Sequence, residues 1–597
     1  MKDLLQRHKG LLGGAVITVT VAAVLAFVPW TAPESWRETL TRRLALSLGA
    51  PELTATGAHF SLLPSPRVSL TRVSFAQNSG TVRGSAEEAV VDLSLLDLLA
   101  GRVKPAALTL RRPDLTIQLP EQSEKGFRSA IELVSQVGGS LLLGQVSAPL
   151  PRLDIDGGRI ALSRGPHGPA QTFDDARLRL RLPNLRSPLA VTFRARQGQT
   201  ETRFSFSGAT PARTLANSRE PITFAYSGQG ITLKFDGEGI VSNAPSLNGK
   251  LSAGTTAAAL GALGFPAVGK PAERVTLNAL LDYSNRGANL ADLKIAVGEE
   301  LYDGVGSVRH DGQRWHVSGT LATAKADMST LLSPITALRK PDGRWNDTAL
   351  DTDALFASSI DLRLSADQML VFQRKLEKVA LSVITRQSKA EVTLGDASWH
   401  KGAVKLRASA APGSFGVDLK LSASLEKADF GAISGDFLRE RRLSGQGNAN
   451  ITLETSGRSI AQFITNAEGR FAAILRNGEL HGIDLNRLAS RRASRGDLAL
   501  TEALGGRTSF ETANLSAKIS NGAAQPVDGH MRAGRLVGTL QGSVDFGQAE
   551  HDLSGLVVQT PADAQAAEPA SVLEFSIQGP LLEPRITPNV AALLRRS

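Results

Sequence analysis

The 597-residue chain contains no cysteine, which excludes disulfide bonds, thiolate catalysis and cysteine-ligated zinc. Aromatic residues make up only 5% of the chain, so it lacks the rings among basic residues on which nucleic-acid bases stack. HExxH, P-loop and GxSxG motifs are also missing. We therefore predict that the protein is not an enzyme, and that it has no cofactor and no nucleic-acid partner.

The nine histidines are scattered, and no metal site is predicted from them. His310 and His316, interpreted as two positions of one strand, would lie about 20 Å apart, which is too far for one metal ion. Asp154-Ile155-Asp156-Gly157 resembles the start of a calcium loop but lacks the later ligands. We expect a turn between strands at this point.

Positive charge is in excess, with a formal net charge of +10. A surface that faces anionic lipid or lipopolysaccharide uses such charge without stacking. General solubility explains it equally well.

One long apolar run is present near the N-terminus. Residues 11–28 carry no charge and would rise about 27 Å as a helix, which is close to the hydrocarbon thickness of a bilayer. Lys2, Arg7 and Lys9 precede this run, which indicates a cytoplasmic N-terminus. A cleaved signal peptide is the competing interpretation, but the run leads into Pro29-Trp30 rather than into a small-residue cleavage site. We predict an uncleaved, single-pass anchor.

Beyond residue 53 the main signal is alternation of apolar and polar residues, which is typical of strands with one apolar face. In one of these stretches Arg177, Arg179 and Arg181 alternate with leucines. The candidate residues for an apolar, lipid-facing surface are Leu178, Leu180, Leu182, Phe204, Phe206, Ile231, Leu233 and Phe235. The pattern alone does not distinguish an open groove from a closed sandwich.

Helical patterns are few and short. Phe127, Ile131 and Val134 form one apolar stripe, and further stretches lie near 255–264, 327–339, 429–438 and 484–492. Asp327 and Asp429 each follow a strand-like stretch and could cap a helix, which suggests a loose internal repeat or a chance similarity. Near the last stretch Arg487, Arg491 and Arg495 share a helical face. They are candidates for contact with lipid headgroups, and a solvated helix face is the alternative.

Two regions resemble the AsmA family. The first contains LTATGAHFSLLPSPRVSLTRVSFAQ and, later, VVDLSLLDLLAGRVKPAALTLRRPDLTI, where we expect a strand to end at Pro113. The second contains GRFAAILRNGELHGIDLNRLASRR, GGRTSFETANLSAKISNGAAQ and EFSIQGPLLEPRITP. The middle of the chain, about 120 to 465, is similar only in style.

The predicted fold is mainly β. A transmembrane helix is followed by an elongated, curved antiparallel sheet that forms an apolar groove, with a few short helices. The predicted regions are a cytoplasmic N-terminus (1–9), a transmembrane anchor (10–29), an AsmA-like N-terminal region (30–120), a helical insertion (121–150), a repetitive groove body (151–465) and an AsmA-like C-terminal region (466–597).

The resemblance implies a protein of the bacterial inner membrane with its body in the periplasm, where it supports outer-membrane biogenesis. AsmA-like proteins are similar to bridge-like lipid transfer proteins, so the expected activity is passive transport of phospholipid between the two membranes. The alternative is a structural protein that assists outer-membrane protein assembly. A glycan-binding role is a third hypothesis. The expected partners are phospholipids and the inner membrane, with outer-membrane or envelope proteins as further candidates.

Overall fold

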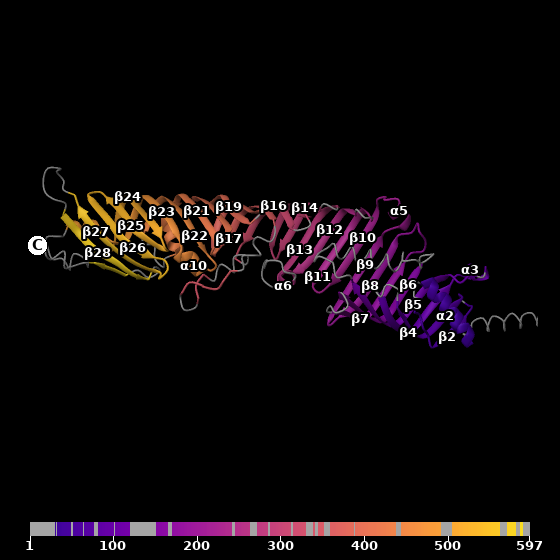
Figure 1. The fold of residues 1–597 in the computed structure, drawn as a ribbon. Coiled ribbons are helices and arrows are strands. Elements are labelled where there is room, and N and C mark those ends of the chain that lie inside the picture. The colour runs from indigo at the N-terminus through magenta and orange to yellow at the C-terminus, as the bar shows by residue number, and fades with distance from the viewer. Residues whose placement is uncertain are drawn as a thin grey trace, which may run out of the picture. The chain divides into compact units, whose positions relative to one another are not determined.

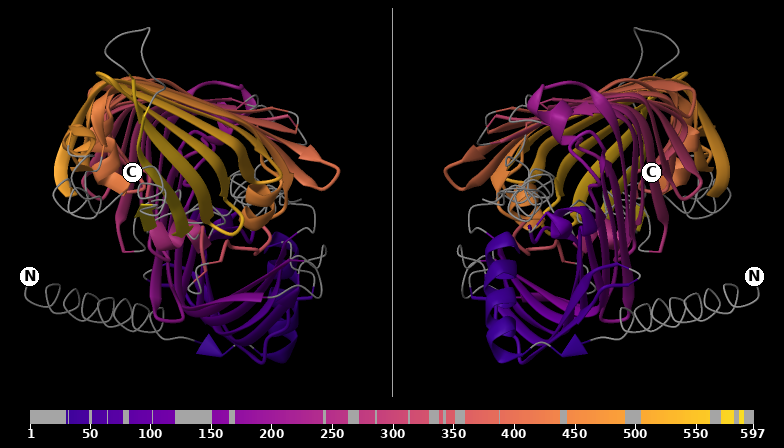
Figure 2. Two further views of the ribbon diagram at one scale, coloured as in Figure 1. Left: turned by 90° about the vertical axis from the view of Figure 1, so that its left-hand side faces the viewer. Right: turned by 90° about the vertical axis from the view of Figure 1, so that its right-hand side faces the viewer.

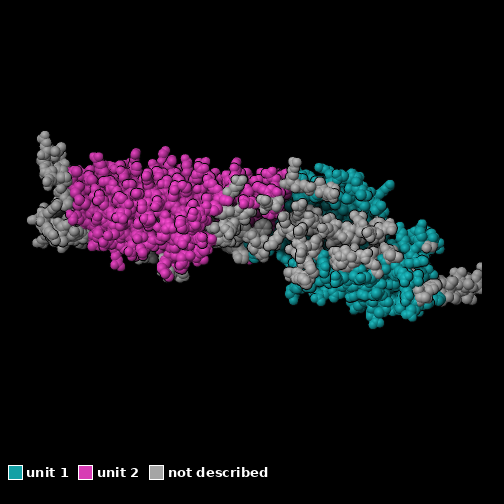
Figure 3. Space-filling view, in the orientation of Figure 1, with its two compact units in different colours: residues 1–259, 280–285 teal, residues 260–279, 286–597 magenta. Residues whose placement is uncertain are grey.

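The fold is described from a computed structural model (Figure 1). It describes residues 30–31, 33–48, 52–63, 65–76, 82–100, 102–119, 151–164, 170–241, 245–262, 272–284, 287–311, 314–329, 338–340, 344–350, 359–386, 388–437, 443–490, 504–560, 570–580 and 585–588. The chain divides into two compact units, Met1–Ala259 with Leu280–Asn285 and Leu260–Ala279 with Arg286–Ser597 (Figure 3).

Unit 1 consists of strands that pair in chain order, β1 with β2 and so on to β12. Its strands are β1 (Trp30–Thr31), β2 (Gly57–Ser61), β3 (Arg67–Ala76), β4 (Val82–Leu93), β5 (Pro105–Leu119), β6 (Arg152–Arg164), β7 (Ala170–Arg181), β8 (Leu189–Gln197), β9 (Thr200–Gly208), β10 (Glu220–Gly228), β11 (Ile231–Ile240) and β12 (Ser246–Thr256). Its helices are α2 (Glu34–Leu48), α3 (Leu95–Leu99) and α5 (Pro211–Leu215). The boundary between the units falls within α6 (Ala257–Ala262) and β13 (Arg274–Ser284).

Unit 2 is built in the same way, with consecutive pairing from β14 to β29. Its strands are β14 (Gly287–Val297), β15 (Glu300–His310), β16 (Trp315–Asp327), β17 (Ser359–Val371), β18 (Arg374–Arg386), β19 (Lys389–Trp399), β20 (Gly402–Gly413), β21 (Gly416–Asp429), β22 (Leu443–Gly457), β23 (Glu468–Ile483), β24 (Leu504–Ser520), β25 (Ala523–Ala533), β26 (Leu536–Asp545), β27 (Glu550–Gln559), β28 (Ala570–Pro580) and β29 (Arg585–Pro588). Its helices are α9 (Phe430–Phe437), α10 (Ile460–Thr465) and α11 (Leu485–Ser490).

The predicted β class is confirmed, but the sheet is not purely antiparallel. β5 pairs with β6 and β16 pairs with β17 in parallel, and each parallel pair follows a long connection, 120–151 and 328–358. Parallel neighbours need such a crossover because the chain must return to the end at which it started. The strands of each unit are curved rather than flat (Figure 2).

A seam of residues with left-handed backbone crosses unit 1 on β3, β5, β6 and β7, and the register of β6–β7 and β7–β8 shifts beside it as a β-bulge does. Arg72, Arg112 and Asp175 have φ of 47°, 43° and 49° there, and Gly157 has 66°. Pro113 lies on this seam inside β5, where the pairing with β6 skips it, so the prediction that a strand ends at Pro113 is wrong. The predicted turn at 154–157 is also wrong, because these residues belong to β6 and Gly157 supplies its bulge. A β-bulge accommodates residues such as proline, which cannot donate a hydrogen bond in a regular strand pair, and it bends the strand.

The short helices agree in part with their patterns. α6, α9 and α11 fall in three of the predicted stretches, and Asp429 caps α9 by accepting hydrogen bonds from the N–H groups of Gly431 and Ala432 at 2.9 and 3.1 Å. Asp327 accepts one from the N–H of Ser329 at 2.8 Å, and residues 330–337 lie outside the described part. The predicted anchor and the helical insertion also lie outside it. None of the helices that the structure does describe is long and apolar enough to cross a membrane.

Candidate functional site: the apolar face of the sheet

The candidate site is one face of the sheet, which we call the apolar face. Directly opposed residues of paired strands point to the same side, so strand register shows which side chains form it. In unit 1 two apolar rows cross all strands from β2 to β12. One row is Phe60, Val68, Val91, Leu108, Leu153, Leu180, Val191, Phe206, Phe224, Phe235 and Leu251, and the other is Ala58, Leu70, Ala89, Leu110, Ile155, Leu178, Phe193, Phe204, Tyr226, Leu233 and Ala253.

All eight residues that the sequence predicted for a lipid-facing surface lie on this face. Six of them, among them Phe204, Phe206 and Leu233, belong to the two rows. Leu182 directly follows β7 and Ile231 begins β11, and both continue the alternation of their strands. Their packing differs: Phe235 is completely buried and stacks on Phe224 at 5.4 Å between ring centroids, whereas Phe204, Phe206, Ile231 and Leu233 are half-buried. Much of the face is therefore partly exposed.

Several side chains of the same face were missed by the sequence analysis. Phe193, Phe224 and Tyr226 stand beside Leu178, Phe206 and Leu233 in the register. Their strands read LAVTFRARQ and EPITFAYSG, which alternate as clearly as the stretches chosen. The period-two signal could have identified them.

The opposite face of unit 1 is polar and basic. Arg177 of β7 pairs with Arg194 of β8, which pairs with Arg203 of β9. All three are exposed, and Arg203 forms an ion pair with Glu201 at 2.6 Å. The hydrogen bond from Arg203 lowers the pKa of the Glu201 carboxyl. On a curved sheet the inner side chains crowd together and the outer ones spread apart, so this exposure pattern puts the apolar face on the inner side of the curve.

Unit 2 carries an apolar row of its own across β14 to β29. The row is Leu293, Gly304, Leu321, Leu364, Leu381, Leu394, Leu406, Ala423, Ile451, Phe471, Ala517, Val527, Gly542, Leu553, Ile577 and Ile586. No ionisable side chain interrupts it. The apolar face is thus a property of each unit.

Two tyrosine hydroxyls lie on the apolar face, Tyr226 in unit 1 and Tyr302 in unit 2. Burial raises the pKa of both phenols. Tyr302 also donates a hydrogen bond to Glu300 at 2.6 Å, which raises its pKa further. Both groups therefore stay neutral at physiological pH, and the face carries no phenolate charge.

Helix α11 covers part of the apolar face of unit 2. Leu485 and Leu488 are buried against Leu475, Phe510 and the neighbouring strands. Thr508 fixes the start of the helix, because its hydroxyl accepts a hydrogen bond from the N–H of Leu485 at 2.9 Å and donates one to the carbonyl of Ile483 at 2.7 Å.

The residues proposed for headgroup contact belong to the same segment. Arg487 lies on α11 and is exposed, on a different side from the buried Leu485 and Leu488. Arg491 and Arg495 lie outside the described residues.

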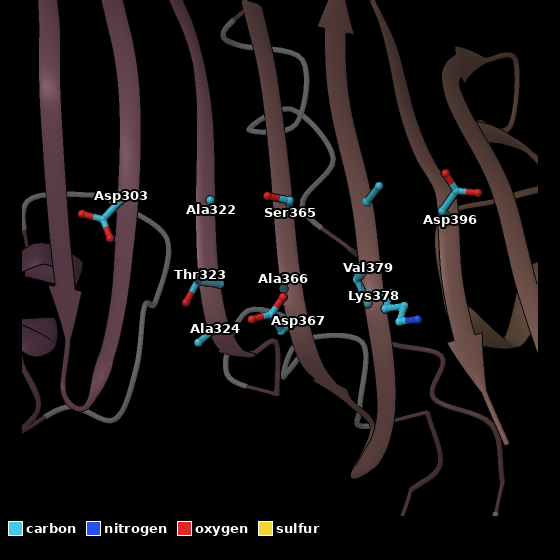
Figure 4. Close-up of a pocket in the computed structure, with 11 residues that line it drawn as sticks. Asp303, Ala322, Thr323, Ala324, Ser365, Ala366, Asp367, Lys378, Val379 and Asp396 are labelled. Carbon is cyan, nitrogen blue, oxygen red and sulfur yellow. The ribbon is translucent and has the colours of Figure 1, made fainter. Parts of the chain in front are cut away.

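A depression of about 560 Å³ lies on the polar face of unit 2 (Figure 4). Asp303, Ala322, Ser365, Ala380 and Asp396 are opposed in register, on the side away from the apolar row. Its full lining is Asp303, Ala322, Thr323, Ala324, Ser365, Ala366, Asp367, Lys378, Val379, Ala380 and Asp396. An acyl chain gains nothing from exposed carboxylates and an ammonium group, so we do not place the lipid path here.

The histidine pair does not lie as the sequence analysis assumed. A turn separates His310 from His316, which therefore stand at neighbouring positions of two paired strands rather than about 20 Å apart on one strand. His310 packs on Trp315 at 4.7 Å, and His316 forms a hydrogen bond with Asp311 at 2.7 Å. Among the described residues no group of three or more His, Asp or Glu side chains could hold a metal ion.

No curated protein matches the chain. A sequence model of the AsmA family matches residues 308–528, from β15 into β25. This match covers the later part of the middle region, which resembled the family only in style, and part of the second quoted region. It does not extend to the N-terminal stretch. The match supports the assignment of the chain to the AsmA family.

Proposed function

We propose that this protein carries phospholipid along its apolar face in the bacterial cell envelope. Membership of the AsmA family is consistent with a role in envelope and outer-membrane biogenesis. The observation that carries the finer proposal is the pair of uninterrupted apolar rows across unit 1, about half of whose side chains remain partly exposed.

The proposed mechanism is passive partitioning. Each acyl methylene that leaves water for the apolar face contributes about 0.8 kcal/mol, and a headgroup can stay hydrated beside the open face. The rows themselves contain no charged side chain, so a tail that followed them would meet no charge. No bond is made or broken, and any directional drive would come from another component.

The lipid path predicts which side chains touch lipid. A photoreactive residue at Phe204 or Leu233 is expected to crosslink phospholipid in cells, because both are half-buried on the apolar face. The matched controls are Arg203 and Lys234, which are sequence neighbours that point to the opposite face. Mass spectrometry of the crosslinked products measures the difference, which we expect to be at least tenfold.

The same experiment tests the alternative function. If Phe204 and Leu233 crosslink an envelope protein instead of lipid, the chain is an assembly factor whose apolar face binds polypeptide. Equal lipid crosslinking from Arg203 and Lys234 would count against a path on one face.

We further propose that residues 10–29 anchor the protein in the inner membrane, with the N-terminus in the cytoplasm and the body in the periplasm. The motivating observation is the uncharged run at 11–28 behind Lys2, Arg7 and Lys9. A reporter fused after residue 50 should be active only in the periplasm, and the mature protein should begin near Met1. A mature N-terminus near residue 30 would show a cleaved signal peptide instead.

A further inference from the structure

The large apolar side chains that unit 1 leaves exposed lie almost entirely at one end of its strands. Of the nine in its described part, eight lie at the end where β2, β4, β7 and β9 finish, and the ninth, Leu280, lies within β13. Seven of them form what we call the leucine rim: Leu62, Leu63, Leu95, Leu96, Leu99, Leu185 and Leu215. The eighth is Trp30.

Three groups of strand connections carry the rim. Leu62 and Leu63 follow β2, and Leu95, Leu96 and Leu99 belong to α3. Leu185 follows β7 and Leu215 ends α5, and a hydrogen bond from the N–H of Ala212 to the carbonyl of Leu185 joins these two connections at 2.9 Å. In Figure 1, α3 lies where β4 ends and α5 lies where β9 ends.

The degree of exposure is unusual for leucine. Leu96, Leu99 and Leu215 are 81%, 77% and 87% exposed. Each of their helices has five residues and contains no buried side chain. The two hairpin turns that the structure describes at the other end of the strands are polar, Gly198-Gln199 after β8 and Gln229-Gly230 after β10. Chance exposure of leucine would not select one end.

Basic side chains accompany the rim. Arg186, Arg213 and Arg219 are exposed in or next to the same connections and form no ion pair with a described carboxylate. Lys104 is also exposed there and interacts electrostatically with Asp97. The carboxylates beside them are already engaged: Asp97 with Arg102 at 3.0 Å, and Glu220 with the N–H of Thr210 at 2.7 Å. The rim therefore combines apolar tips with an excess of positive charge.

The chain also enters unit 1 at this end. β1 runs antiparallel to β2 and pairs Trp30 with Phe60, near the end of β2, so β1 begins at the rim end of the strands. Trp30 is half exposed, as an interfacial tryptophan would be. The preceding sequence is the uncharged run at 11–28.

We propose that the leucine rim docks unit 1 onto an anionic phospholipid bilayer, with α3 and α5 inserted at the level of the headgroups. The tips of α3 and α5 are five strands apart, or about 24 Å along the sheet. A fluid bilayer can accept such separate apolar tips, while its anionic headgroups attract the neighbouring cations. This inference rests on the proposed membrane location and adds to it the surface that faces the membrane.

The absence of cysteine makes the test direct. Full-length Leu96→Cys and Leu215→Cys proteins, labelled with a polarity-sensitive dye, are mixed with phosphatidylcholine vesicles containing one-third phosphatidylglycerol and a spin-labelled quencher lipid. Gln199→Cys, at the opposite end of the strands, is the matched control. We expect quenching at positions 96 and 215 to exceed that at 199 at least fivefold, and to fall severalfold in pure phosphatidylcholine.

A second pair of variants separates insertion from folding. Leu95→Asp with Leu99→Asp should reduce the quenching of the dye at position 96 at least fivefold, because a charge resists entry into the bilayer. Leu280→Asp, which changes an exposed leucine away from the rim, should leave the quenching unchanged. All these positions are exposed, so the variants should fold.

The remaining outcomes are decisive. Equal dye responses at positions 96, 215 and 199 would overturn the proposal. A change in the dye at position 96 that occurs without vesicles and grows with protein concentration would also overturn it, because that result indicates that two copies of the chain pair through the rim. The predicted membrane anchor is tested separately: if it is wrong, alkaline carbonate will release the full chain from cell membranes. The dye at position 96 would still report contact of the rim with the added vesicles.

Discussion

Replacing Phe206 or Leu233 with aspartate is expected to leave the protein folded and to stop lipid transport. Both side chains are half-buried on the apolar face, so the new carboxylate can reach water and its cost to folding is small. An acyl tail that follows the rows would instead meet a charge, which repels it strongly in an apolar surrounding. The expected result is near-normal protein levels, at least tenfold less lipid crosslinking at a photoreactive Phe204, and a defective outer-membrane barrier.

Phe235→Asp is the informative contrast, because it changes the same face with a different expected outcome. Phe235 is completely buried and stacks on Phe224, so a carboxylate at position 235 would have no access to water. We expect a loss of several kcal/mol in the stability of unit 1, seen as degraded or insoluble protein. Ser205→Asp, on the polar face beside Phe206, is the control and should change neither stability nor crosslinking.

These variants also decide between an open path and a closed core. If Phe206→Asp and Leu233→Asp unfold unit 1 as severely as Phe235→Asp, the face is sealed and the lipid path is wrong. Folded protein with normal crosslinks and an intact barrier would show that lipid passes elsewhere.

The second large effect is expected where α11 closes over the apolar face of unit 2. Leu485 is buried in a cluster with Phe510 and Leu536, so Leu485→Ala removes packing that the surrounding strands cannot fully recover. The expected destabilisation is about 2–5 kcal/mol. Thr508→Val should cost about 1–3 kcal/mol, because it leaves the N–H of Leu485 and the carbonyl of Ile483 without a partner.

Hydrogen exchange of the full chain measures this effect locally, which matters because a protein with two units need not unfold in one step. Both variants should lose protection in α11 and β24, with unit 1 unchanged. Leu556→Ala, on the polar face of β27, is the matched control and should retain wild-type exchange. Unchanged protection of α11 in Leu485→Ala would mean that the helix does not depend on this contact.

Strand pairing explains where the sequence analysis succeeded on the site and where it stopped. Which side of a strand is apolar depends only on residues two positions apart, and so Phe204 and Phe206 were assigned to one face correctly. That Phe206 lies between Val191 and Phe224 depends on which strands are neighbours, which no local pattern records. The same gap led to the wrong geometry for His310 and His316, because a hairpin turn was interpreted as a continuous strand.

The sequence by itself determined the β class, the apolar and polar sides of strands such as β7, β9 and β11, the cap of α9 at Asp429 and the resemblance to the AsmA family. These follow from alternation, local hydrogen bonding and motif order, all of which act over a few residues. Only the tertiary structure decided the parallel pairs β5–β6 and β16–β17, the continuation of β5 through Pro113, and the collection of exposed leucines at one end of unit 1. The physical reason is that register and strand direction join residues distant in the chain. The free energy of those contacts belongs to pairs of strands and not to either strand alone.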